Sequence, residues 1–264
     1  MKKVKILTNK CFRLAEGAMH VGRQKNQCGK AFTLAEVLIT LTVVAVLAIL
    51  TIPTIISNST ERATVSQLKK VYSTLSQAYT LAVQGNGTPN NWGIGGYSDP
   101  VIINKIKPYL SVSKDCTDGS SGCFPPGVKY RLLKTGDDGI YNDTPQPKLQ
   151  LADGTLLYAR SDDPSCGWNV GSSPTIYVCG GYYADINGWK GPNQWGKDVF
   201  QFWLTQYGIV PAGTVPETYR SFPNNCKDKS NADGFGCAAW VLYIENLDYL
   251  HCNNLDWTGP TKCN

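Results

Sequence analysis

The sequence predicts an α+β protein with one long N-terminal helix packed on an antiparallel-sheet head whose loops are closed by disulfides. A stretch of 24 residues without a charge, 37–60, passes directly into an amphipathic helical pattern. The remainder carries short apolar runs separated by Gly, Asn, Asp and Pro, and the 264 residues contain 10 cysteines, many for a cytosolic protein. We therefore divide the chain into a leader (1–31), a helix (32–84) and a globular head (85–264).

The leader accounts for the whole positive charge of the chain. The net charge is +5, from 25 Lys and Arg against 20 Asp and Glu, but residues 1–31 hold eight of those cations and one acid. Residues 32–264 are therefore slightly acidic, at about −2. A basic segment before an apolar run is typical of a targeting or membrane-orienting signal. The alternative, a nucleic-acid-binding arm, is disfavoured because no folded basic module follows.

The charge-free run predicts a transmembrane segment at about 34–57, because about 20 apolar residues suffice to cross a bilayer as a helix. The basic leader would keep the N-terminus in the cytoplasm and place the head outside it. A cleaved secretory signal is the alternative, but this run is longer than such signals and no small-x-small site follows. Pro53 is expected to kink the helix or to melt a turn locally.

An amphipathic helix is expected to continue over about 61–84. Apolar residues recur there at spacings of three and four, which places them on one face. Gly85 to Pro89 should end the helix, which would be roughly 75 Å long at 1.5 Å per residue. The predicted buried face comprises Val65, Leu68, Val71, Tyr72, Leu75, Ala78, Tyr79 and Ala82.

Glu36 is the one acid at the start of the apolar helix. A carboxylate in the centre of a membrane helix costs about 2.5–3.5 kcal/mol, so this side chain needs a partner. The helix N-terminus offers a partial positive charge and a free α-amine offers a full one. Cleavage before Phe32 would create such an amine one turn from Glu36. The alternative is an acid that extends to the lipid headgroups.

The segment Gly29–Val37, with the sequence GKAFTLAEV, resembles the class III leader junction of type IV prepilins and type II secretion pseudopilins. The resemblance extends over residues 29–84 and implies a pilin-like fold. It implies cleavage after Ala31 by a prepilin peptidase on the cytoplasmic face, with N-methylation of Phe32. It also implies that Glu36 pairs with the N-terminal amine of a neighbouring subunit, and that Pro53 is the family's helix-kinking proline.

Two features depart from that family. Ala31 stands where the family usually has glycine, and a leader of 31 residues is long. Translation from Met19 would shorten the leader to 13 residues, so both start positions stay open.

The head is expected to be an antiparallel sheet, because its apolar runs are short and turn signals separate them. Asp153-Gly154 lies between two such runs and predicts a hairpin. The predicted strands are 128–133, 149–151, 155–159, 175–179 and 240–244.

An even number of cysteines outside the cytoplasm favours four disulfides, for which eight cysteines allow 105 connectivities. Their clustering along the head favours sequential pairs. Zinc is the alternative, but no C-x2-C pair occurs and His251 is the one histidine of the head. The expected pairs are Cys116 with Cys123, Cys166 with Cys179, Cys226 with Cys237, and Cys252 with Cys263.

A loop over residues 185–198 suggests a calcium site. Asp185, Asn187, Asn193 and Asp198 supply carboxylate and amide oxygens, which Ca²⁺ prefers, although the spacing is not that of an EF-hand. Some pseudopilins, which the N-terminus resembles, bind Ca²⁺ in a head loop. The alternative is a polar turn ordered by Asx and Gly chemistry, with Asp198 capping the stretch 199–207. The sequence suggests no other cofactor.

The head contains no GxSxG, HExxH or P-loop motif, so we do not expect an enzyme. The expected function is that of a structural, minor subunit of a type IV pilus or a type II secretion pseudopilus in the bacterial inner membrane. Its expected partners are the prepilin peptidase and methyltransferase and other pilin or pseudopilin subunits; nothing in the sequence points to nucleic acid. The alternatives are a membrane-tethered adhesin or carbohydrate- or protein-binding head that never polymerises, and an anchored extracytoplasmic enzyme.

Overall fold

The computed structural model describes residues 32–134, 136–139, 146–172, 176–227 and 230–263. The leader, and with it the predicted cleavage residue Ala31, lies outside these ranges. The chain divides into two compact units, Met1–Thr51 and Ile52–Asn264. Each is described by itself below.

Helix α1 (Leu34–Asn86) is the longest element, with 53 residues. Its helical assignment is continuous over Pro53, so the local melting considered for that position does not occur. The helix ends where the glycines predicted it: Gly87 adopts a φ of 74°, and its N–H donates to the Val83 carbonyl at 2.9 Å.

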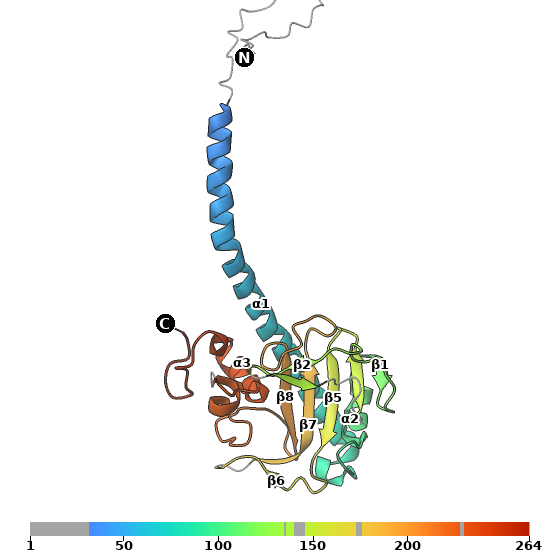
Figure 1. The fold of residues 1–264 in the computed structure, drawn as a ribbon. Helices are drawn as coiled ribbons and strands as arrows, with labels where there is room; N and C mark the ends of the chain where they lie inside the picture. Colours follow the sequence, from blue (N-terminus) through green and yellow to red (C-terminus); the bar gives the residue numbers. More distant parts are fainter. Residues whose placement is uncertain (1–31, 135, 140–145, 173–175, 228–229, 264) are drawn as a thin grey trace, which may run out of the picture. The chain divides into compact units, whose positions relative to one another are not determined.

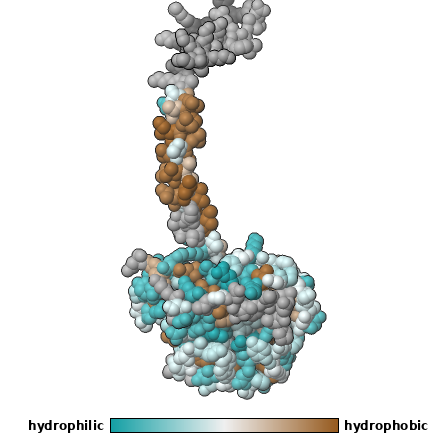
Figure 2. Space-filling model, viewed as in Figure 1, coloured by the Kyte–Doolittle hydropathy of each residue, from teal (hydrophilic) through white to brown (hydrophobic). Residues whose placement is uncertain are grey.

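The first part of α1, Leu34–Ile52, has the length and composition of a membrane span. Its mean hydropathy is 2.5, and none of it is buried. Figure 2 shows this stretch as a hydrophobic, brown column. The predicted apolar segment is thus one exposed helix, long enough to cross a bilayer.

The second part of α1 lies in the larger unit and buries the face that its periodicity predicts. Two tyrosines of this face also anchor it by hydrogen bonds. The Tyr72 hydroxyl donates to the Ile209 carbonyl at 3.3 Å, and the Tyr79 hydroxyl donates to the Gln206 carbonyl at 2.8 Å. The residues less than a tenth exposed are Val65, Leu68, Val71, Leu75, Ala78, Tyr79 and Ala82.

The head is built on a seven-stranded antiparallel sheet in the order β1-β4-β5-β7-β8-β9, with β6 paired to β7. The second part of α1 packs on this sheet, which makes the protein α+β, as predicted (Figure 1). The strands of the sheet are β1 (Val112–Cys116), β4 (Lys148–Leu151), β5 (Leu156–Ser161), β6 (Trp168–Asn169), β7 (Tyr177–Asp185), β8 (Val199–Thr205) and β9 (Ile209–Pro211).

Short elements surround the sheet. A separate two-stranded ribbon pairs β2 (Tyr130–Arg131) with β3 (Asp137–Gly139). The short α-helices are α2 (Val101–Ile106) and α3 (Ala238–Ile244). Single turns of 3₁₀ or π helix occur at Pro89–Asn91, Lys107–Tyr109, Pro223–Lys227, Phe235–Cys237 and Asp248–Leu250.

The two faces of the sheet have different coverings. The inner face, with Leu157, Tyr182 and Phe202, joins α1 in the main core. The outer face, with Tyr158 and Tyr183, is covered by loops of the head and forms a second cluster. Residues that alternate along one strand therefore enter different environments.

The Asp153-Gly154 hairpin is confirmed. It joins β4 to β5, Gly154 has a φ of 92°, and the Leu151 N–H donates to the Thr155 carbonyl at 2.9 Å. The predicted strand 128–133 is shorter than expected, because only Tyr130–Arg131 pairs. Of the predicted strand 175–179, residue 175 lies outside the described residues and the rest belongs to the longer β7.

Two segments differ from the sequence expectation. Residues 240–244 belong to helix α3, not to a strand, because a continuous apolar run suits a buried helix as well as a buried strand. Residues 199–205 form the fully buried strand β8, so Asp198 does not cap a helix there. Its carboxylate instead accepts N–H groups that precede it, from Asn193 and Gln194.

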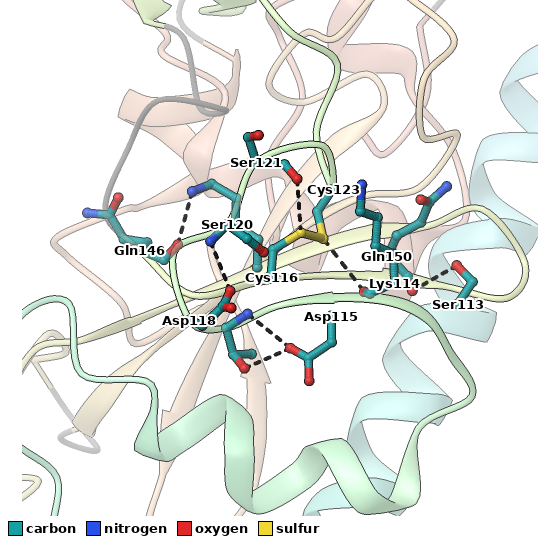
Figure 3. The surroundings of a disulfide bond; sticks show 12 residues. Ser113, Lys114, Asp115, Cys116, Asp118, Ser120, Ser121, Cys123, Gln146 and Gln150 are labelled. Carbon is teal, nitrogen blue, oxygen red and sulfur yellow. Dashed lines mark hydrogen bonds between the residues drawn. A yellow bond between two sulfur atoms is a disulfide. The ribbon is translucent and has the colours of Figure 1, made fainter.

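All four predicted disulfides are present. They close loops with sequence separations of 7, 13, 11 and 11 residues. Figure 3 shows the first, Cys116–Cys123, with Asp118 accepting the Ser120 N–H at 2.9 Å inside the closed loop. Local Asx turns and a covalent link therefore order this loop together.

Candidate functional site

The N-terminus of α1 carries the residues predicted to direct processing and assembly. Phe32 precedes the helix and its side chain is 85% exposed. The Glu36 carboxylate accepts the Thr33 N–H and the Thr33 hydroxyl, both at 2.8 Å. The Glu36 N–H in turn donates to Thr33 Oγ1 at 3.2 Å. These reciprocal bonds form a capping box.

The capping box was not anticipated, although its T-x-x-E spacing is visible in Thr33–Glu36. It supplies hydrogen-bond donors from Thr33 to the Glu36 carboxylate, which the sequence predicts to need a partner. In a single chain Glu36 is therefore hydrogen-bonded without a second subunit. Its pairing with the amine of a neighbouring Phe32 remains a prediction.

The four residues predicted to bind calcium lie together in the head. Asp185 is the last residue of β7 and Asp198 directly precedes β8, and these strands pair with Asp185 opposite Val199. Sheet pairing therefore brings the two carboxylates to one end of the hairpin. Both aspartates and Asn193 are less than a tenth exposed, and Asn187 is partly buried.

Hydrogen bonds hold both carboxylates in the 185–198 loop. Asp185 accepts the Asn187 and Gly188 N–H groups at 3.3 and 3.0 Å, and the Tyr130 hydroxyl at 2.6 Å. Asp198 accepts the Asn187 side-chain amide at 3.1 Å, besides the two N–H groups named above. Burial, followed by the charge of Asp198, raises the pKa of Asp185 to about 8.

Oxygen atoms meet at the centre of this loop. The Lys190 carbonyl and Asp185 Oδ2 both accept hydrogen bonds from the Asn193 side-chain amide, at 3.1 and 3.2 Å. The Asn187 side-chain oxygen is buried and has no hydrogen-bond partner among the described residues.

The donor set fits calcium better than a transition metal. Across the described ranges no group of three or more His, Cys, Asp or Glu side chains comes together. Two carboxylates, two amides and a carbonyl remain, and these are oxygen ligands that suit Ca²⁺. The residues that would hold the ion are Asp185, Asn187, Asn193 and Asp198, with the Lys190 carbonyl.

Calcium is expected to stabilise the full-length protein in detergent. At a hundredfold excess over Kd, one bound ion contributes about 2.7 kcal/mol, which should raise the midpoint of thermal unfolding by several degrees relative to EDTA. Asp198→Asn should remove the difference between the unfolding midpoints in calcium and in EDTA, whereas Asp118→Asn, in the separate loop closed by Cys116–Cys123, should retain it. Equal unfolding midpoints of the wild type in calcium and EDTA would instead favour a loop ordered by its own hydrogen bonds.

His251 lies near this loop but does not join the predicted ligands. Its Nε2 is 2.8 Å from Glu61 Oε1 on α1, and its side chain is about half exposed. Both residues line a groove of about 460 Å³ that also borders Asn187, Pro192 and Asp198. The contact fastens the disulfide-closed C-terminal loop to the helix.

Comparison of the chain with family models, with curated proteins and with solved structures found no match. The resemblance to prepilins therefore rests on the N-terminal motif and on the architecture. That architecture, a long apolar N-terminal helix on an antiparallel sheet, is pilin-like. The apolar helix and the disulfides indicate a membrane-anchored or secreted extracytoplasmic protein.

Proposed function

We propose that this chain is a structural, minor subunit of a type IV pilus or of a type II secretion pseudopilus. The observation that carries the proposal is helix α1, of whose apolar N-terminal part, Leu34–Ile52, nothing is buried in the single chain. Such a surface needs lipid or other apolar helices around it. Its continuation packs into a globular head, so one helix links a membrane-compatible tail to a folded domain.

Maturation is the first step of the proposal. A prepilin peptidase cuts after Ala31 on the cytoplasmic face, and the new N-terminus at Phe32 is methylated. The exposed position of Phe32 directly before the first helical turn supports access by such enzymes. The leader, with its excess of Lys and Arg, sets the orientation before it is removed.

Assembly is the second step. The subunit waits in the bacterial inner membrane with its head outside the cytoplasm, and the tails of many subunits then bundle into the core of a filament. In that core the Glu36 carboxylate pairs with the Phe32 amine of a neighbouring subunit. This pair favours the correct axial register between neighbouring tail helices, because any other register leaves a charge unpaired in an apolar environment. The head is a binding and packing domain, not a catalytic one.

Intact-mass analysis of the protein from membrane and sheared-filament fractions tests the proposal. We expect the filament fraction to contain a chain that has lost residues 1–31 and gained one methyl group. In cells that lack the prepilin peptidase, the full precursor should accumulate in membranes and be missing from filaments. An uncleaved chain in wild-type cells, confined to membranes, would favour the alternative of a tethered head that does not polymerise.

A further inference from the structure

The last of the four disulfides, Cys252–Cys263, differs from the other three in its exposure. Cys252 and Cys263 are partly exposed, whereas the six cysteines of the other disulfides are at most 1% exposed. The residues on both sides of Cys252, His251 and Asn253, are exposed, and so is Lys262 directly before Cys263. Thiol–disulfide exchange requires a thiolate to reach one of the two sulfur atoms. Of the four disulfides, this one therefore offers a reductant the most direct access in the folded head.

The C-terminal loop that this disulfide closes, residues 252–263, is also held by contacts that do not involve the sulfur atoms. Trp257 packs against Trp240 at a ring-centroid distance of 5.0 Å. Leu255 is fully buried, and its carbonyl accepts a hydrogen bond from the Lys227 ammonium group. These contacts keep the loop on the head when the S–S bond opens. Reduction of this disulfide therefore changes the freedom of the loop without unfolding the head.

The same loop is connected to helix α1. His251 directly precedes Cys252, and its Nε2 lies 2.8 Å from Glu61 Oε1 on α1. Both residues line the groove of about 460 Å³ described above, together with Leu250 and Thr64. A disulfide limits the conformations open to the segment that it closes. Opening the bond gives Cys252 and the adjacent His251 more freedom, so the contact with Glu61 is broken more often.

We propose that Cys252–Cys263 is a redox-active disulfide, which a dithiol protein of the extracytoplasmic space opens in the folded head, and that its opening loosens the C-terminal loop from α1. One thiolate of the dithiol attacks a cysteine sulfur and breaks the S–S bond, which leaves a mixed disulfide. The second thiol of the reductant then attacks this mixed disulfide and releases the cysteine. The head gains two electrons and two protons, and the dithiol becomes a disulfide.

Differential alkylation of the full-length protein in detergent tests the site of reduction. Cys11 and Cys28 of the leader are first blocked with N-ethylmaleimide. The protein is then treated without denaturant with dithiothreitol or with reduced thioredoxin, trapped with iodoacetamide and mapped by peptide mass spectrometry. We expect Cys252 and Cys263 to be alkylated at least tenfold faster than any other cysteine of the head. Urea well below the unfolding midpoint should leave this rate unchanged, because the reaction needs no unfolding.

Hydrogen exchange of the double variant Cys252→Ser/Cys263→Ser tests the effect on the loop. We expect amide exchange over residues 250–263 to be at least threefold faster than in the oxidised wild type. Modification of His251 by diethyl pyrocarbonate should also be faster, because its ring is held less often by Glu61. Cys116→Ser/Cys123→Ser is the matched control. It opens a buried disulfide that also closes a short loop, and it should leave exchange over 250–263 unchanged.

Three results would overturn the proposal. The first is reduction of another disulfide before Cys252–Cys263, or of all four together. The second is an acceleration by urea of labelling at Cys252 and Cys263 as large as at the buried cysteines. The third is exchange over 250–263 in Cys252→Ser/Cys263→Ser equal to that of the oxidised protein. If this variant does not fold, the labelling of the wild type still decides the site of reduction. None of these results bears on cleavage or filament assembly, which the intact-mass experiment tests separately.

Discussion

Replacing Glu36 with glutamine is expected to lower incorporation of the chain into filaments at least tenfold, while cleavage after Ala31 and membrane insertion stay normal. Glutamine at this position can still complete the capping box with Thr33, so the start of α1 should be intact. Only the negative charge is lost. In an apolar filament core, removing one partner of a charge pair costs about 3–5 kcal/mol, because the neighbouring amine then remains unpaired.

Thr33→Ala is the complementary variant. It removes the hydroxyl of the capping box, which costs about 0.5–2 kcal/mol of helix stability, but it retains the Glu36 carboxylate. We expect near-normal incorporation. Quantitative immunoblots of sheared filaments against membrane fractions measure both variants. Two results would contradict the charge pair: a loss of incorporation in Thr33→Ala as large as that in Glu36→Gln, or normal incorporation of Glu36→Gln. In either case the role of Glu36 would be to complete the capping box.

Trp240→Ala is expected to lower the free energy of unfolding of the head by about 3–5 kcal/mol, the cost of removing a large aromatic side chain from a core. Trp240 is fully buried, stacks on Phe222 at a centroid distance of 4.1 Å and contacts Trp257 at 5.0 Å. Its indole N–H donates to the Asn246 side chain at 2.9 Å. That side chain donates in turn to the Thr261 carbonyl, so the substitution also loosens the C-terminal loop.

Trp189→Ala is the control for this prediction. Trp189 is 53% exposed in the 185–198 loop, so its removal should change the free energy of unfolding by less than about 1 kcal/mol. Urea titrations followed by far-ultraviolet circular dichroism compare the two variants in the same buffer. Similar losses in the free energy of unfolding from both substitutions would mean that the aromatic cluster around Trp240 does not stabilise the head.

The features that the sequence predicted well depend on local patterns. The membrane-length helix and its buried face follow from a charge-free run and a spacing of three and four, and both lie within α1. The Asp153-Gly154 hairpin and the sequential disulfides involve residues close together in the chain. In each case one segment contains all the information that the prediction needs.

The features that the sequence did not predict depend on distant residues. Residues 240–244 are a buried apolar run, and only packing against partners such as Phe222 decides between helix and strand. Arg160 and Tyr183 come to the same face of the sheet through the register of β5 and β7, and a shift of one residue would place them on opposite faces. Composition and motifs contain no signal for such a meeting of side chains.

The four disulfides have a consequence for export of the head. Each joins a cysteine to the next one along the chain, so no pair encloses or crosses another. In a head translocated in chain order, each cysteine meets its own partner before any later cysteine has emerged. Oxidation on emergence would then favour the native set of pairs over any other.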